Sequence, residues 1–432
     1  MAQPKPLPSL SEERLIGHNA LVAGGTILAG GLGFAFQIVV SHSLHPSNYA
    51  AVFAAMTLLT LVSLPASALT LLMARETSRD RANGHSAASV ALLRSGNQTL
   101  LIVGVVLGLV FAVGSPWIGA FFSLQSVYVV AVAAGMPVAL ALPLLMGELQ
   151  GQQRFLSFSL LNIGQAGLKL FAAIGLGLAL GPIGVVVGLA VASTISYGVA
   201  FMLVRRRLAI RLGMVWLRPA LRYLALILPS TLALSILLSA DVLLVKHFFS
   251  SRAAGEYSAV AALGRAIFWG AAGIAAVLFP KVIFRESQGQ SGSQIVGFSL
   301  GLVGFGGIAG LAVLGVAAKP VLAAFAGSAY AAGASILPPY AIAMTLLGAA
   351  SVLIATHQSR ARAAFLSILL PITVAEPVLI IALHQSLMQV VWIVALSMGA
   401  LVVGLAILMA RQPVHRLSDN PLSIVAIAEA QA

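Results

Sequence analysis

Long apolar segments fill almost the whole chain, and they restrict it to one environment. About twelve stretches of membrane-spanning length follow one another between residues 19 and 410. Hydrophobic residues make up 60% of the sequence and charged residues only 8%, so a water-soluble domain could not cover this apolar surface. An α-helix needs ~20 residues to cross the ~30 Å hydrocarbon core of a bilayer. The sequence therefore predicts an all-α, polytopic membrane protein.

The distribution of Lys and Arg predicts how the chain enters the membrane. The expected spans are 19–41, 48–74, 97–120, 126–147, 157–180, 183–204, 222–246, 257–280, 296–318, 332–356, 362–384 and 387–410. With the N-terminus in the cytosol, 19 of the 24 basic residues fall in inside loops and three in outside loops. Cytosolic loops of membrane proteins carry such an excess, so we expect both termini in the cytosol. The same rule explains the net charge of +13 without a nucleic-acid partner.

Two stretches that lie half a chain apart resemble one another. VVSHSLHPSNYAAVFAA and LVKHFFSSRAAGEYSAVAA align His42 with His247 and Tyr49 with Tyr257. Six spans in each half would make the halves parallel repeats around a central cavity, the plan of many secondary transporters. The predicted organisation is a cytosolic tail at 1–18, a six-helix bundle at 19–204, a basic linker at 205–221, a second, pseudo-symmetric bundle at 222–410 and a cytosolic tail at 411–432.

Four ionisable residues lie inside the expected spans, where a charge costs at least ~2.5–3.5 kcal/mol. Lys169 lies ~18 Å from the cytosolic end of its span, too deep for its amine to reach the interface. Glu376 occupies the equivalent position in the second half. We predict that Lys169 binds an anionic headgroup and that Glu376 is a proton- or cation-linked carboxylate, a structural contact being the alternative for each. Asp241 and Arg265 lie at similar depths in the membrane. They form a structural ion pair, or Arg265 is a second cationic ligand of the substrate and Asp241 adjusts its charge.

Polar amides mark the expected pathway through the protein. Asn162, Gln165 and Lys169 recur at i, i+3 and i+7, which places them on one helical face. A polar stripe facing lipid would be costly, so this face should look into protein or water. Together with Gln37, these amides are expected to bind substrate in the cavity.

The motifs of several other functions are missing from the sequence. It contains no GxxxxGK[ST] phosphate loop and no HExxH pair, so ATP hydrolysis and metal-dependent hydrolysis have no visible machinery. The chain has no cysteine, which excludes thiolate metal sites and catalytic thiols. No loop between spans is long enough for a catalytic domain. We therefore expect no enzymatic activity, no metal and no cofactor.

Two segments resemble a known transporter family. LLSADVLLVKHFFSSRAAGEYSAVAALGRAIFWGAAGIAAVLFPKV is similar to the span 7–8 hallmark of the polysaccharide (Wzx-type) flippases, members of the multidrug/oligosaccharidyl-lipid/polysaccharide exporter superfamily. GELQGQQRFLSFSLLNIGQAGLKLFAAIGL is similar to the family's loop into span 5. The family pattern in the first segment is matched by Asp241, Gly255, Tyr257, Arg265 and Pro280.

This resemblance implies a flippase of the bacterial inner membrane. Such a protein moves an undecaprenyl-pyrophosphate-linked oligosaccharide from the cytosolic to the periplasmic leaflet by alternating access, for exopolysaccharide, capsule or O-antigen assembly. Its implied partners are the lipid-linked substrate, membrane lipids, and a polysaccharide polymerase with its co-polymerase. The chain departs from the family in its modest length, its short outer loops and its few cavity cations.

Other functions of the same superfamily stay open. The main alternative is a cation-coupled multidrug exporter, which should keep uncompensated carboxylates in its first bundle. The first six expected spans contain no Asp or Glu in their interiors, and this argues against it. A peptidoglycan-precursor flippase ranks lower because it usually has extra spans and more cavity arginines.

Overall fold

The computed structural model describes residues 12–82, 87–210, 218–287, 293–359 and 363–411, and within these ranges it contains helices and no strand. The first part of the chain forms α1 (Glu12–Ser43), α2 (Pro46–Ala82), α3 (Ala87–Val113), α4 (Ser115–Phe121), α5 (Ser126–Gly151), α6 (Phe155–Leu180) and α7 (Pro182–Leu208). The second part forms α8 (Arg218–Leu237), α9 (Ala240–Phe248), α10 (Ser251–Ser287), α11 (Ser293–Ala326), η1 (Ser328–Ile336), α12 (Leu337–Ser359), α13 (Leu366–Ala382) and α14 (Leu387–Arg411).

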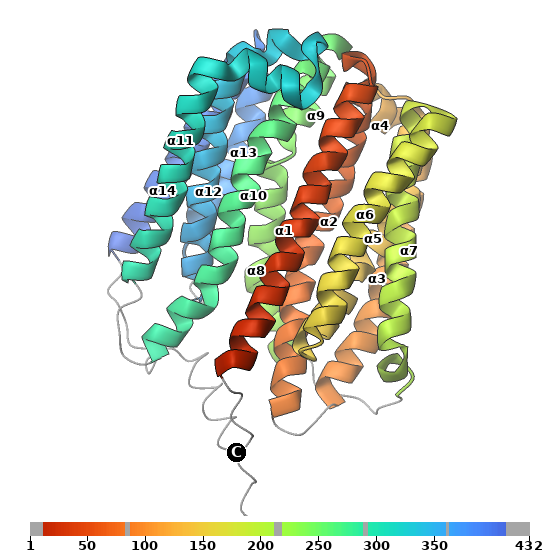
Figure 1. Ribbon diagram of the computed structural model, residues 1–432, viewed down its shortest axis with the longest axis vertical. Coiled ribbons are helices and arrows are strands. Elements are labelled where there is room, and N and C mark those ends of the chain that lie inside the picture. Colours follow the sequence, from red (N-terminus) through yellow and green to blue (C-terminus); the bar gives the residue numbers. More distant parts are fainter. Residues whose placement is uncertain (1–11, 83–86, 211–217, 288–292, 360–362, 412–432) are drawn as a thin grey trace, which may run out of the picture.

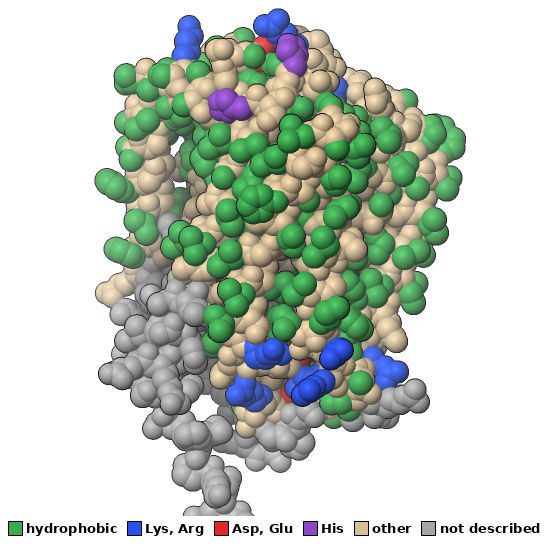
Figure 2. All heavy atoms as spheres, turned by 45° about the vertical axis from the view of Figure 1, so that its right-hand side comes forward, with side chains coloured by type: hydrophobic (Ala, Val, Ile, Leu, Met, Phe, Trp, Pro, Cys, Tyr) green, Lys and Arg blue, Asp and Glu red, His purple; other side chains and the backbone are tan. Residues whose placement is uncertain are grey.

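The helices confirm an all-α, multi-pass membrane protein. Ten helical segments among the described residues are long and apolar enough to cross a membrane, and α13 is a shorter apolar helix. Large aliphatic and aromatic side chains cover the flank of the molecule, and Lys and Arg side chains gather at one end of it (Figure 2). We call this the arginine end. The count of twelve spans and the side of the membrane on which the termini lie stay predictions.

Some helices begin or end away from the expected spans. α1 begins at Glu12, within the predicted tail at 1–18, and α7 and α8 extend into the predicted linker at 205–221. The expected span 97–120 is interrupted after Val113, where Pro116 enters the first turn of α4 without an N–H to donate. Residues 1–11, 211–217 and 412–432 of the predicted tails and linker lie outside the described part of the chain.

Two groups of helices lie side by side, with α2 and α8 at their junction (Figure 1). In one group α2 packs against α5, α5 against α3 and α7, and α6 against α1 and α7. In the other group α12 packs against α10, α11 and α14. α8 contacts both α2 and α13, and α2 also packs against α10. The exact division at 205–221 into two bundles stays a prediction.

Hydrogen bonds join the two groups of helices at the end of the molecule opposite the arginine end. The Ser41 hydroxyl donates to the Phe325 carbonyl at 3.1 Å, and the Tyr330 hydroxyl donates to the Leu44 carbonyl at 2.8 Å. At the same end α10 approaches the start of α2 so closely that a Cβ on Gly255 would lie 2.0 Å from the Pro46 carbonyl oxygen. Only glycine allows this approach. The two groups of helices are therefore in contact at this end, which we call the outer end because the sequence predicts that it faces away from the cytosol.

Candidate substrate and ion sites

A buried carboxylate at the start of α9 collects three donors. Asp241 is 1% exposed. Its Oδ2 accepts hydrogen bonds from the Tyr257 hydroxyl at 3.0 Å and the Tyr340 hydroxyl at 2.9 Å. Its Oδ1 accepts one from Nη2 of Arg265 at 3.2 Å, so the ion pair expected from their depths is present. Two tyrosines and one arginine satisfy a charge that would otherwise be expensive to bury.

Arg265 also reaches across the junction between the two groups. Its guanidinium carbon lies 5.3 Å from the centre of the Phe53 ring on α2, a cation–π contact. Arg265 on α10 therefore contacts a carboxylate from its own group of helices and an aromatic ring from the other group. A change in how α2 and α10 pack would alter its surroundings directly.

Glu376 on α13 is the unpartnered member of this region. Its side chain is fully buried, and neither carboxylate oxygen has a hydrogen-bond partner among the described residues. α13 packs against α8 and α9, which brings Glu376 within electrostatic range of Asp241 and Arg265. Two carboxylates and one guanidinium leave one negative charge unbalanced when all three are ionised. A proton or one monovalent cation would balance it.

The polar stripe of α6 lies opposite the lipid-facing side of that helix. Leu156, Leu160, Phe171 and Leu178 are 58%, 59%, 70% and 86% exposed. Each of these exposed residues lies nine positions, or two and a half helical turns, from a residue of the stripe. The exposed residues and the stripe therefore lie on opposite sides of α6. Gln165 is opposite Leu156, Asn162 is opposite Phe171, and Lys169 is opposite both Leu160 and Leu178. Asn162 and Lys169 are half-buried on this side of α6, and Gln165, also half-buried, lies at its edge and borders a cavity between α6 and α7.

Lys169 is a cation without a counter-charge. It is half-buried, and the described residues offer its amine no acidic partner and no hydrogen bond. A satisfied structural lysine would have a carboxylate or carbonyl within reach. An amine left in this state attracts an anion strongly because the surrounding dielectric constant is low.

Gln37 has a partner that extends the internal repeat. The Tyr49 hydroxyl donates to Gln37 Oε1 at 3.3 Å, and the aligned tyrosine, Tyr257, donates to Asp241. Both tyrosines are fully buried. Each half thus holds a tyrosine hydroxyl against a polar side chain of the preceding helix, an amide in one half and a carboxylate in the other.

The structure joins some of the predicted site residues and separates others. Asp241, Arg265 and Glu376 form one region in the second group of helices. Asn162 and Lys169 share the inward face of α6 in the first group. No described contact joins these two sets. No group of acidic and histidine side chains among the described residues could hold a metal ion.

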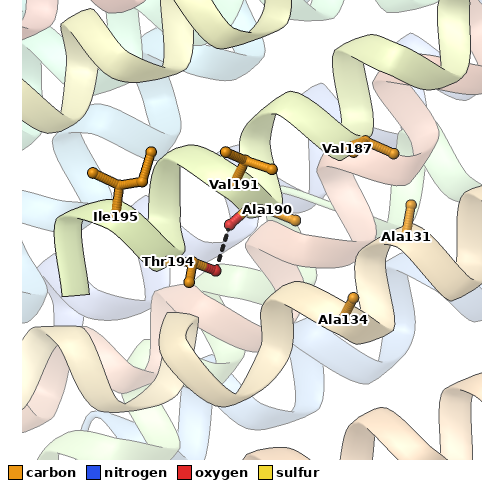
Figure 3. Close-up of a pocket in the computed structure, with 7 residues that line it drawn as sticks. All are labelled: Ala131, Ala134, Val187, Ala190, Val191, Thr194 and Ile195. Carbon is orange, nitrogen blue, oxygen red and sulfur yellow. Dashed lines mark hydrogen bonds between the residues drawn. The ribbon is translucent and has the colours of Figure 1, made fainter. Parts of the chain in front are cut away.

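Lys169 and Arg265 do not line either of two cavities in the described part of the chain. One, of about 300 Å³, lies between α5 and α7 and is lined by alanine, valine, isoleucine and Thr194 (Figure 3). Thr194 provides the polar side chain of this lining. Its hydroxyl already donates to the Ala190 carbonyl at 2.8 Å. The other lies between α6 and α7 and includes Gln165. The expected wet central chamber stays a prediction.

Three acids that the structure buries beyond the expected spans were missed from the sequence, Glu76, Asp80 and Glu148. Glu148 lies one residue beyond the expected span 126–147, but α5 continues to Gly151 and the side chain is fully buried. It pairs with Arg207 of α7 at 2.8 Å and accepts a hydrogen bond from Thr77 of α2 at 2.5 Å. Arg207 also donates to Ser89 of α3 at 2.8 Å. Arg207 and Thr77 compensate the Glu148 carboxylate and tie four helices together at the arginine end, and the buried Asp80 accepts a hydrogen bond from the Ser89 amide at 2.6 Å.

The comparisons come from solved structures, because no protein-family model and no curated protein matches the sequence. A multidrug resistance MATE family transporter of the MOP superfamily, in an inward-facing conformation, matches with a TM-score of 0.70 and 16% identity over 94% of this chain and 96% of that one. The lipid II flippase MurJ, in an inward closed conformation, matches with a TM-score of 0.70 and 12% identity over 95% and 93%.

A MATE family transporter in an outward-facing conformation matches less well, with a TM-score of 0.61 and 17% identity over 90% of this chain and 93% of that one. Solved relatives of the same architecture thus include both inward-facing and outward-facing forms. At these identities the matches concern the fold and not the substrate. The chain has the fold of the MOP-superfamily transporters.

Proposed function

We propose that this chain is an alternating-access flippase that moves an undecaprenyl-pyrophosphate-linked oligosaccharide from the cytosolic to the periplasmic leaflet of a bacterial inner membrane. The observation that carries the proposal is the unpaired Lys169 on the inward face of α6. A pyrophosphate carries at least two negative charges, and an ammonium group in a low-dielectric site binds it strongly. The lipid tail can stay in the bilayer while the headgroup crosses between the two groups of helices.

The neighbours of Lys169 suit a glycan. Asn162 lies on the same face and presents an amide, which both donates and accepts hydrogen bonds. Gln165 and Gln37 have the same chemistry, although Gln37 already accepts from Tyr49 and Gln165 borders the cavity between α6 and α7. Arg265 is the second cationic ligand of the proposal. Because Asp241 already neutralises it, we expect Arg265 to contribute less than Lys169.

The pathway of the proposal is exopolysaccharide, capsule or O-antigen assembly. In it, the flipped substrate passes to a polysaccharide polymerase and its co-polymerase at the outer face of the membrane. Both proteins would act on the sugar that this chain delivers, so their contact surfaces would lie near the outer end.

A cation-coupled multidrug exporter is the second candidate, favoured by the MATE matches and by the buried pair of carboxylates, Asp241 and Glu376. A cationic drug would need a free acid in its path. In the first group of helices the inward face of α6 offers a cation instead, and the buried Glu148 is already paired with Arg207. These charges favour an anionic substrate.

Vesicle assays with the purified full-length chain separate the two functions. The first probe is undecaprenyl-pyrophosphate-linked disaccharide with a fluorophore on the sugar, and dithionite quenching reports the leaflet that it occupies. We expect the protein to expose inner-leaflet probe that stays protected in protein-free vesicles. Ethidium, a cationic drug, is the second probe and should not move. Transport of ethidium without movement of the lipid-linked sugar would contradict the proposal and favour the exporter.

Replacing Glu376 by glutamine is expected to weaken the dependence of transport on pH or on Na⁺. The amide preserves the shape of the side chain but removes the negative charge that we propose a proton or cation balances. The measurement is the initial rate of flipping across a pH series and a Na⁺ series, with Glu256→Gln at the outer end as the matched control. An E376Q protein with the wild-type dependence on both ions would remove Glu376 from the coupling role.

A further inference from the structure

A narrow groove runs between α6 and α7 on the membrane side of the molecule. Its volume is about 280 Å³, and leucine, valine and glycine provide most of its walls. Leu160 and Val199 form its rim and are 59% and 44% exposed, while Leu161 is buried at its base. Such a surface is open to hydrocarbon and not to water.

The length of the groove matches one leaflet of a bilayer. On α6 its lining begins at Ser157 and ends at Leu168. Eleven residues of α-helix rise ~16 Å, and half of a ~30 Å hydrocarbon core is ~15 Å. The groove therefore spans one leaflet from its headgroup side to about the midplane. A single lipid chain would lie along it in its normal orientation.

Arginines surround the headgroup end of the groove. Arg154 precedes α6, and its Nη1 donates to the carbonyl of Leu203, a groove residue on α7, at 2.8 Å. Arg206 lies three residues beyond Leu203 on the same side of α7 and is exposed. Neither arginine has an acidic partner among the described residues. The apolar groove and the positive charge thus meet at the depth where a lipid changes from chain to phosphate.

We propose that this groove is a binding site for one anionic phospholipid, with an acyl chain between α6 and α7 and its phosphate against Arg154 and Arg206. Anionic lipids are enriched in the cytosolic leaflet, which is where the arginine end is expected to lie. A phospholipid is favoured over the transported substrate because of the position of the groove. α7 packs on α2, α3, α5 and α6 and lies at the edge of the molecule, away from the junction with α8 and α10 (Figure 1).

One residue of the groove provides a clean way to block it. A Cβ added at Gly164 would have no atom within 4 Å, so a leucine there fills the groove without disturbing the packing of α6. Gly198 on α7 is equally open but does not line the groove. Gly164→Leu and Gly198→Leu are therefore a matched pair. Arg411→Gln, an exposed arginine at the end of α14, is the control for charge removal.

The test is native mass spectrometry and equilibrium binding of the full-length chain with phosphatidylglycerol or phosphatidylcholine of identical chains. We expect one phosphatidylglycerol to bind at least ~10-fold more tightly than phosphatidylcholine. Gly164→Leu should remove this site, and Gly198→Leu should keep it. Replacing Arg154 and Arg206 by glutamine should weaken binding of phosphatidylglycerol ~30-fold, from the usual contribution of a basic residue near anionic lipid, whereas Arg411→Gln should change nothing.

Three outcomes would overturn the proposal. Equal affinity for both lipids would mean that the groove holds only unselected bilayer lipid. Unchanged phosphatidylglycerol binding in Gly164→Leu, with the protein eluting as the wild type does, would place the lipid elsewhere. Displacement of bound phosphatidylglycerol by equimolar undecaprenyl phosphate would identify the groove as a site for the prenyl chain of a substrate instead.

Discussion

Replacing Lys169 by alanine is expected to abolish transport of the lipid-linked sugar while leaving the protein folded in the membrane. In the proposed function its ammonium is the main counter-charge for the pyrophosphate. Removing one partner of a buried charge pair typically costs ~2–5 kcal/mol, so we expect binding of undecaprenyl pyrophosphate to weaken at least ~30-fold. The measurements are binding of that probe to purified protein and dithionite-resolved flipping in vesicles.

Two further variants make the Lys169 result specific. Lys169→Arg keeps the charge and should retain most of the binding. Lys319→Ala removes an exposed lysine from α11 and should have no effect. Full transport by Lys169→Ala would mean that the lysine has no part in substrate binding, and the flippase proposal would lose its main support.

Replacing Gly255 by alanine is expected to force the outer end apart. The new Cβ would lie 2.0 Å from the Pro46 carbonyl oxygen, whereas non-bonded carbon contacts need about 3.5 Å. The backbones of α2 and α10 must therefore separate by about 1.5 Å at this point. Packed interfaces tend to switch between discrete arrangements rather than stretch, so we expect a larger population of molecules open at this end.

The absence of native cysteine makes this expectation measurable. Single cysteines at Ser43 and Ser250, both exposed at the outer end, would be the only spin-labelled positions. Electron–electron distance distributions between them should shift to longer values in Gly255→Ala. Gly198→Ala, where a Cβ meets no atom within 4 Å, is the control. Identical distributions in the two variants would show that the contact at Pro46 does not hold the outer end closed.

Features that depend on spacing along one helix could be predicted from the sequence. The i, i+3, i+7 pattern of Asn162, Gln165 and Lys169 is sufficient to place them on one side of their helix, because a helix fixes the direction of each side chain. The pairing of Asp241 with Arg265 followed from counting their depths. Both inferences need only the rise and turn of an α-helix.

Features that depend on packing between helices could not be predicted in this way. The approach of Glu376 to Asp241 and Arg265 requires the position of α13 against α9. Glu148 was overlooked because its helix extends four residues beyond the apolar run, and its partner Arg207 lies 59 residues away in the chain. Nothing local distinguishes a solvated Glu at a helix end from one buried by a neighbouring arginine.

The paired contacts of Tyr49 and Tyr257 differ in charge. Tyr49 donates to Gln37, and Tyr257 donates to Asp241. The amide of Gln37 is neutral, whereas Asp241 forms an ion pair with Arg265. The two related positions therefore hold different groups, whatever the symmetry of the scaffold. A charged cargo that passed between the halves would meet chemically different surfaces on its two sides.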